Sequence, residues 1–257
     1  KGEKELIIGG EKFVEGEGLE TTNFTASITN VKESGTKNSF EYTLSNETMA
    51  NNYDILTSFG TLNITPRTVI LQSATDSKVY DGKPLVNNTV TELDSSLGFV
   101  EGEWNSFRFA ETATRTNVGT ATNEFEVVLN DGKSLDNYTI KKSFGTLTVT
   151  DAGGVIIVDP GTSASIEGDS IHKVYDGNKV TLNVVTKNSE DEVIDTDYNY
   201  VINGQAADEL PTMLDAGEWT ITFTPKDENL KDLSKTVTVT IEKRPYTVET
   251  ASAEKVY

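Results

Sequence analysis

The stretch DNYTIKKSFGTLTVT, Asp136–Thr150, decides the fold of this chain. A related stretch, NNYDILTSFGTLNIT, occupies Asn51–Thr65, and the FVEGE that begins at Phe99 also begins at Phe13. The members of the two pairs are separated by nearly the same number of residues. Matches at a fixed period are the signature of a tandem repeat. The chain is therefore expected to consist of similar modules.

The pentapeptide KVYDG marks the start of a module. It occupies Lys78–Gly82 and Lys173–Gly177, and the sequence ends on its first three letters, Lys255–Tyr257. We interpret the motif structurally: its tyrosine packs on the core, and its Asp-Gly pair supplies the positive φ of a tight turn. The alternative interpretation is a ligand-contacting loop repeated in each module.

The repeat anchors predict four segments. Repeat one covers residues 1–66 and lacks its first strand, and repeat two covers residues 67–151. A diverged repeat three covers residues 152–243, and residues 244–257 begin a fourth unit. The last segment duplicates the strand that repeat one lacks. We therefore weigh a head-to-tail self-association in which segment 244–257 is added to repeat one of a neighbouring molecule.

Alternating apolar and polar residues predict strands at Val180–Val184, Trp219–Phe223 and Val237–Ile241. One apolar face per sheet requires a second sheet packed on it. Repeats of about 90 residues fit small β-sandwiches of the immunoglobulin-like type, which have roughly 100. We expect an all-β chain of tandem modules in an elongated array. The alternative is a β-grasp-like module, which needs a helix across its sheet.

The sequence at the end of repeat one has the pattern of a β-hairpin. Tyr53–Ile55 and Leu62–Ile64 lie on either side of a bend at Ser58–Gly60. This pattern predicts a closing hairpin. In repeat three, the DAGEW at Asp215–Trp219 resembles the corner of immunoglobulin-like sandwiches, with Trp in place of Tyr.

The composition excludes several classes of protein. The chain has 22 Lys and Arg against 41 Asp and Glu, a net charge of −19, which disfavours nucleic acid and anionic membranes as partners. No apolar run is long enough to span a bilayer, so no membrane insertion is expected. Cysteine is absent, which excludes disulfides and thiolate chemistry. An acidic, cysteine-free chain rich in Thr and Asn is typical of bacterial surface proteins.

The order of these motifs resembles the MBG/YDG-type tandem repeats of bacterial cell-surface adhesins. KVYDG opens the unit, FVEGE follows a Leu-Gly step, Gly-Thr begins a strand, and FGTLTVT closes the unit. The resemblance covers repeat two almost completely, repeat one from Phe13, and repeat three mainly at KVYDG and DAGEW. It implies an extracellular location on a bacterial cell surface, in a Gram-positive cell wall, and a role as a stalk or in adhesion.

Candidate sites are few. The only histidine, His172, has no second histidine or nucleophile elbow beside it, so we expect no catalytic residue, no cofactor and no enzymatic activity. Lys78 and Asn137 have the residue types of an intramolecular isopeptide bond. The simpler interpretation is an exposed lysine and an asparagine that caps a turn.

A calcium site is a further hypothesis. Asp195, Asp197 and Asn199 alternate as at the start of an EF-hand loop, but Tyr200 replaces the required glycine and the final glutamate is missing. A solvated acidic loop is therefore the preferred interpretation, and calcium binding the alternative.

The preferred function is a non-catalytic stalk that presents an adhesive or binding domain. In the first alternative, the modules themselves bind a host or cell-surface glycan or protein through exposed aromatic residues such as Trp104 or Tyr198. In the second, they are accessory modules of a carbohydrate-active enzyme whose catalytic domain lies outside this chain.

Overall fold

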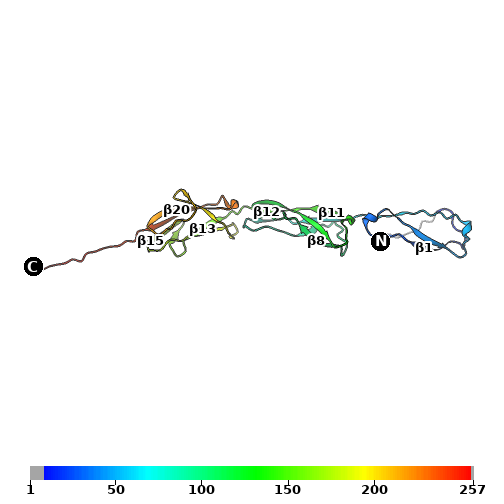
Figure 1. Ribbon diagram of the computed structural model, residues 1–257, viewed down its shortest axis with the longest axis horizontal. Coiled ribbons are helices and arrows are strands. Elements are labelled where there is room, and N and C mark those ends of the chain that lie inside the picture. The colour runs from blue at the N-terminus through cyan, green and yellow to red at the C-terminus, as the bar shows by residue number, and fades with distance from the viewer. Residues whose placement is uncertain (1–8, 256–257) are drawn as a thin grey trace. The chain divides into compact units, whose positions relative to one another are not determined.

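Strands make up nearly all the regular structure of the computed structural model, which describes residues 9–255 (Figure 1). The strands are β1 (Leu19–Phe24), β2 (Thr36–Lys37), β3 (Phe40–Leu44), β4 (Thr61–Leu62), β5 (Arg67–Ser73), β6 (Asp76–Val79), β7 (Val90–Glu92), β8 (Trp104–Phe109), β9 (Gly119–Asn123), β10 (Phe125–Leu129), β11 (Tyr138–Ser143), β12 (Gly145–Thr150), β13 (Val155–Asp159), β14 (Ser165–Glu167), β15 (Ser170–Val174), β16 (Asn183–Lys187), β17 (Val193–Ile194), β18 (Tyr198–Ile202), β19 (Gln205–Ala207), β20 (Gly217–Pro225) and β21 (Lys235–Glu242).

The helical segments of the described chain are short 3-10 turns. They are η1 (Val31–Glu33), η2 (Ala50–Asn52), η3 (Leu135–Asn137) and η4 (Glu228–Leu230). The expected all-β fold of sandwich-like sheets is confirmed. Residues 9–255 contain no α-helix that could cross a sheet, as the β-grasp alternative requires.

The chain divides into two compact units. Of the described residues, the first unit contains 9–72, 90–108 and 126–143, and the second contains 73–89, 109–125 and 144–255. The border runs through the sequence of repeat two. The compact units and the sequence repeats are therefore different divisions of the chain.

The first unit contains short sheets. Strand β1 pairs with β3, and β2 pairs with β4, both antiparallel. Strand β5 lies between β11 and β7, and its pairing with β11 is parallel, from Arg67 opposite Tyr138 to Gln72 opposite Ser143. Two segments far apart in the sequence of repeat two thus lie side by side.

The second unit contains the largest sheet, in the order β14-β15-β21-β20-β18-β19, and a three-stranded sheet, β13-β16-β17. Its main core joins residues of both sheets: Ile156, Val158, Ile171, Val180, Met213, Ile221, Phe223, Val237, Val239 and Ile241. Trp219, from the predicted corner, packs against this cluster. The alternating apolar residues recognised in the sequence therefore do face a common interior.

The predicted closing hairpin is wrong. In repeat one, β4 pairs with β2, and Tyr53–Ile55 belongs to no strand. In repeat two, the corresponding strands β11 and β12 belong to different sheets, because β12 pairs with β6 and β9. The step between them falls at Gly145, where an added Cβ would lie 2.1 Å from the carbonyl oxygen of Ala74. The glycine permits a close approach of two backbones and does not reverse the chain.

Candidate functional site

The two complete KVYDG motifs fold in the same way. The Lys78 ammonium lies 2.5 Å from the Asp81 carboxylate, and Lys173 lies 2.9 Å from Asp176. Each carboxylate also accepts a hydrogen bond from the backbone N–H two residues further on, at 2.9 Å in both copies. The glycine that follows has a φ of 77° in the first copy and 84° in the second. The positive φ predicted for the Asp-Gly turn is confirmed.

The two tyrosines of the motif differ sharply in exposure. Tyr80 is 4% exposed, whereas Tyr175 is 40% exposed. Each donates its backbone N–H to the strand that ends its repeat, Tyr80 to Thr150 at 3.0 Å and Tyr175 to Glu242 at 2.9 Å. Because the local backbone is the same, the difference must come from what covers the ring.

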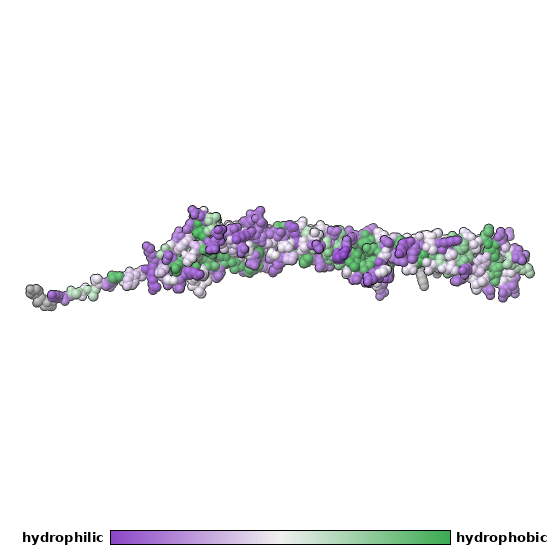
Figure 2. All heavy atoms as spheres, in the orientation of Figure 1, coloured by the Kyte–Doolittle hydropathy of each residue, from purple (hydrophilic) through white to green (hydrophobic). Residues whose placement is uncertain are grey.

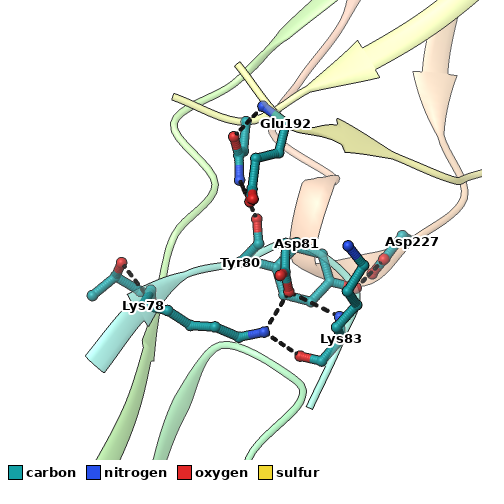
Figure 3. Close-up of polar contacts among 8 residues, drawn as sticks. Lys78, Tyr80, Asp81, Lys83, Glu192 and Asp227 are labelled. Carbon is teal, nitrogen blue, oxygen red and sulfur yellow. Dashed lines mark hydrogen bonds and ion pairs between the residues drawn. The ribbon is translucent and has the colours of Figure 1, made fainter. Parts of the chain in front are cut away.

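Residues of repeat three cover Tyr80 (Figure 3). Its hydroxyl donates a short hydrogen bond to the carboxylate of Asp227, the residue that caps η4. The side-chain amide of Asn188 donates to the Tyr80 carbonyl oxygen at 3.3 Å. Tyr80 therefore packs at a boundary between repeats, a more specific position than the core contact expected from the sequence.

Apolar side chains surround this contact. They form a second cluster of buried residues, Tyr80, Leu85, Leu147, Val149, Ala152, Ile194 and Leu230, with Leu233 packed against it. Ile194 and Leu230 come from repeat three, and most of the others from repeat two. Burying a side chain of leucine size contributes about 1.5–3 kcal/mol. The two repeats thus share part of their hydrophobic core.

The buried pair at the boundary has shifted pKa values. Burial and the hydrogen bond to Asp227 raise the pKa of Tyr80 to about 12. Burial alone would raise the pKa of Asp227, but hydrogen bonds from Tyr80 and from Asn229 outweigh it, so its pKa is lowered. At neutral pH the pair therefore consists of a protonated phenol and an ionised carboxylate, which is the state that forms the hydrogen bond.

A second contact at the same boundary uses an asparagine of η4. The side-chain oxygen of Asn229 accepts a hydrogen bond from the backbone N–H of Val118 at 2.9 Å. Its side-chain nitrogen donates to the side-chain oxygen of Asn117 at 3.3 Å. The same asparagine also donates to Asp227 at 2.8 Å, which links this contact to the tyrosine contact.

The same two-point asparagine contact occurs between repeats one and two. The side-chain oxygen of Asn137, in η3, accepts from the backbone N–H of Val31 at 2.9 Å, and its nitrogen donates to Asn30 at 2.9 Å. Both receiving segments read Thr-Asn-Val, at Thr29–Val31 and Thr116–Val118. This repeated tripeptide is the signal that could have revealed the contact from the sequence alone.

The two isopeptide candidates have other partners. The Lys78 ammonium is bound by Asp81 and by the Lys83 carbonyl oxygen at 2.6 Å. The Asn137 amide makes the contact with Asn30 and Val31. Lys78 belongs to the second compact unit and Asn137 to the first. The isopeptide bond stays an untested hypothesis, and these contacts favour its absence.

The calcium candidates lie along an extended segment. Asp197 accepts a backbone hydrogen bond from Lys226 at 2.8 Å through its carbonyl oxygen, and Asn199 is paired with Thr224 in the sheet. Asp195, Asp197 and Asn199 are all exposed. Within residues 9–255, no group of three or more His, Cys, Asp or Glu side chains is placed to hold a metal ion. Calcium binding stays a prediction.

The two aromatic candidates have different environments. Trp104 is 43% exposed and stacks on Phe99, with ring centroids 6.4 Å apart and planes at 16°. Figure 2 shows apolar residues gathered on the surface near β8 and β11, and Trp104 is the first residue of β8. Tyr198, in contrast, packs edge-on against Phe223 and shares a hydrogen bond of 2.7 Å with Thr186. The expectation that Tyr198 is exposed is wrong, because its ring belongs to the edge of the repeat-three core.

The chain was compared with protein families, curated proteins and solved structures. No protein-family model matches the chain, and no curated protein matches it. Fibronectin(III)-like modules of Clostridium thermocellum CbhA are 11% identical, over 69% of this chain and 96% of that chain, with a TM-score of 0.23. Extracellular cadherin domains 1–4 of protocadherin gamma B7 are 12% identical, over 83% of this chain and 58% of that chain, with a TM-score of 0.24.

No helix in the described part of the chain is long and apolar enough to cross a bilayer.

Proposed function

We propose that this chain is a non-catalytic repeat region of a bacterial extracellular surface protein of the MBG/YDG type, and that it acts as a spacer that presents a binding domain. One observation carries the proposal: the same asparagine contact recurs at two successive repeat boundaries. A module that has only to fold needs no repeated contact geometry at its end. A module that must hold the next module in place needs such a contact.

The contacts suit a spacer physically. A flexible connection would let neighbouring repeats take many orientations, and the mean reach of a flexible chain grows only with the square root of its length. At the second boundary, the buried Tyr80 and the Asn229 contact restrict these orientations. The net charge of −19 adds repulsion between arrays and keeps them apart.

Surface display tests the spacer role directly. The chain is placed between a membrane anchor and an epitope tag on a bacterial cell, and a Gly/Ser linker of equal length replaces it in the comparison strain. Capture of the cells by large antibody-coated beads is then measured. We expect stronger capture with the native chain, because a stiffer spacer lifts the tag further from the surface. Equal capture by the two strains would contradict the proposal.

The second candidate function is ligand binding by the repeats themselves. It is favoured by Trp104, because an exposed ring stacked on a neighbouring ring, as on Phe99, offers a flat face of the kind on which sugars stack. A glycan array probed with the whole chain tests it. Binding that is lost in Trp104→Ala and retained in Tyr175→Ala would support this function. An array without specific signal would leave the spacer role as the better explanation.

A further inference from the structure

Strand β13 holds in repeat three the place that β5 holds in repeat two. Each precedes the strand that contains the first residues of KVYDG, β6 or β15, and that strand pairs in parallel with the strand that ends the repeat. Each also pairs with the first strand after the motif, β5 with β7 and β13 with β16. The two strands are therefore counterparts in the fold.

The two counterparts differ in the neighbour on their other side. In repeat two, β11 lies there and pairs in parallel with β5, so β5 is an interior strand. In repeat three, residues 231–234 form no strand and connect η4 directly to β21, which joins the large sheet. Within residues 9–255, no strand lies on the outer side of β13. Repeat three therefore leaves open the position that β11 fills in repeat two.

The backbone of β13 is unpaired along this open side. Its ladder with β16 runs from Val155 opposite Lys187 to Asp159 opposite Asn183. Outside that ladder, no hydrogen bond in the described part of the chain uses a backbone group of residues 155–159. An edge strand presents its remaining N–H and C=O groups away from the sheet, where they are a template for another strand.

The side chains of β13 are apolar on both faces of the strand. Ile156 and Val158 are buried in the main core of the second unit. Val155 and Ile157 point to the opposite face and are 58% and 43% exposed. Strands that are apolar on both faces are typical of covered positions, and natural edge strands are usually protected by charges. Asp159, the last residue, is the only charged residue of β13. The strand thus has an interior sequence at an edge position.

Strand β11 shows which kind of segment fits beside such a strand. It places two apolar residues, Tyr138 and Ile140, before two lysines. Because β11 and β5 are parallel, these lysines lie toward the C-terminal end of β5. The C-terminal end of β13 carries the exposed Asp159. Opposite charges on neighbouring strands attract each other, so a lysine-bearing strand of this kind is complementary to β13.

We propose that β13 is a docking site for an extended segment of another protein, which pairs in parallel with β13 as β11 pairs with β5. The segment has alternating apolar residues followed by lysine or arginine. Its backbone pairs with the open edge, its apolar side chains pack beside Val155 and Ile157, and its cations lie near Asp159. The net charge of −19 favours such a basic segment over a second copy of this chain. The site adds a partner to the proposed spacer and does not rest on that role.

A peptide with the sequence of residues 137–144, NYTIKKSF, is the probe, because it contains the whole of β11. The isotope-labelled full chain is titrated with this peptide, and the backbone amide resonances are followed by NMR, which detects weak binding. We expect saturable shifts at residues 155–159 and none at β19, the edge of the large sheet. Absence of saturable shifts at residues 155–159, or equal shifts at β13 and β19, would overturn the proposal.

Two methylated peptides test the strand pairing itself. One carries a methyl group on the backbone nitrogen of the residue that corresponds to Thr139, and the other carries it on that of Ile140. Neighbouring N–H groups of a strand point to opposite sides, so only one of the two faces β13. We expect one methylated peptide to bind about 10-fold more weakly and the other to bind as the parent peptide does. Equal affinities of the two would overturn strand pairing.

Sedimentation velocity of the chain alone separates the proposed occupant from a second copy. We expect the chain to stay monomeric over a concentration series. Association that rises with concentration and slows hydrogen exchange at residues 155–159 would overturn the proposal, because a second copy would then cover β13.

Two lysine variants localise the binding. Val193, in β17, is 60% exposed on the same face of the sheet as Ile157, with β16 between the two strands. Ile157→Lys brings a cation next to the lysines of the peptide, and we expect binding to weaken by about 10-fold. Val193→Lys adds the same charge further from the open edge, and we expect unchanged binding. Equal affinities of the two variants would overturn docking at β13.

The charge contact is tested by Asp159→Asn. This variant removes the charge and keeps the side-chain oxygen that accepts the Gly161 N–H at 2.8 Å. We expect the peptide to bind about 2- to 5-fold more weakly, and Glu167→Gln, on exposed β14, to have no effect. Unchanged binding to Asp159→Asn would overturn the charge contact. Because the substituted side chains are exposed, the variants are expected to fold as the parent chain does, and their thermal unfolding curves provide the check.

Discussion

The side chain of Asn229 accepts a hydrogen bond from the backbone N–H of Val118 at 2.9 Å, across the boundary between two sequence repeats. At the preceding boundary, the side-chain oxygen of Asn137 accepts a hydrogen bond from the backbone N–H of Val31, also at 2.9 Å. In both places the asparagine lies in a 3-10 turn and the receiving residue follows another asparagine. The boundary contact is therefore a repeated structural feature. The contribution of each of its residues to stability can be measured separately.

Removal of one asparagine should loosen one boundary. In Asn137→Ala, the Val31 amide loses its acceptor, and hydrogen exchange at Val31 is expected to accelerate by about 5-fold, which corresponds to about 1 kcal/mol. The control is Asn52→Ala in dilute solution, since Asn52 holds the same position in an exposed turn. If both variants leave the exchange rate at Val31 unchanged, the contact contributes nothing.

The hydroxyl of Tyr80 should stabilise the second compact unit. Tyr80→Phe removes the hydrogen bond to the Asp227 carboxylate, and a hydrogen bond to a charged group is worth about 1.5–3 kcal/mol. Tyr175→Phe, at the exposed tyrosine of the same motif, is expected to change the free energy of unfolding by less than about 0.5 kcal/mol. Urea unfolding of the two variants measures the difference. Equal effects would show that the boundary position of Tyr80 has no energetic importance.

Stability of the boundary should depend on pH at both extremes. The pKa of Asp227 is lowered in the folded chain, so its contribution is present above about pH 4 and is lost as the pH falls through the lowered value. The pKa of Tyr80 is raised to about 12, so its contribution is present below about pH 10 and is lost between there and about 12. The destabilisation caused by Tyr80→Phe should therefore shrink over that alkaline range. A constant difference from neutral to strongly alkaline pH would contradict this assignment.

The intact mass should equal that of the unmodified sequence. The Lys78 ammonium is bound to Asp81, and the Asn137 amide is bound to Asn30 and Val31, so neither group is free to react with the other. An isopeptide bond would release one ammonia. A mass lower by one ammonia, lost on substitution of Lys78 by Arg, would show that the bond forms.

The repeats and the β class could be predicted from the sequence because both are periodic. Strand alternation at Val237–Ile241 reflects burial on one face, and the Asp-Gly of KVYDG reflects a local φ requirement. Sheet partners could not be predicted in the same way. The signal at Gly145 is equally compatible with a reversal and with a close backbone approach, and only the position of Ala74 distinguishes them.

The boundary contacts were only partly visible in the sequence. Tyr80 and Tyr175 have identical neighbours in KVYDG, yet Tyr80 is buried and Tyr175 is exposed. Tyr80 is buried because Asp227 and Leu230 contact it. Those residues are more than a hundred positions away from Tyr80 in the chain. The Thr-Asn-Val tripeptide was a usable signal. Its meaning, however, depends on an asparagine in another repeat.

Tyr80 and Asn229 are expected to hold the adjoining strands of repeats two and three, within the second compact unit, in one orientation. Because the chain has no cysteine, spin labels can be placed at two exposed strand positions as Thr122→Cys and Asn199→Cys. The distribution of distances between the labels is then measured by pulsed electron spin resonance. We predict one narrow distribution in the parent chain and a clearly broader one after Tyr80→Phe with Asn229→Ala. A broad distribution in the parent chain itself would contradict the claim.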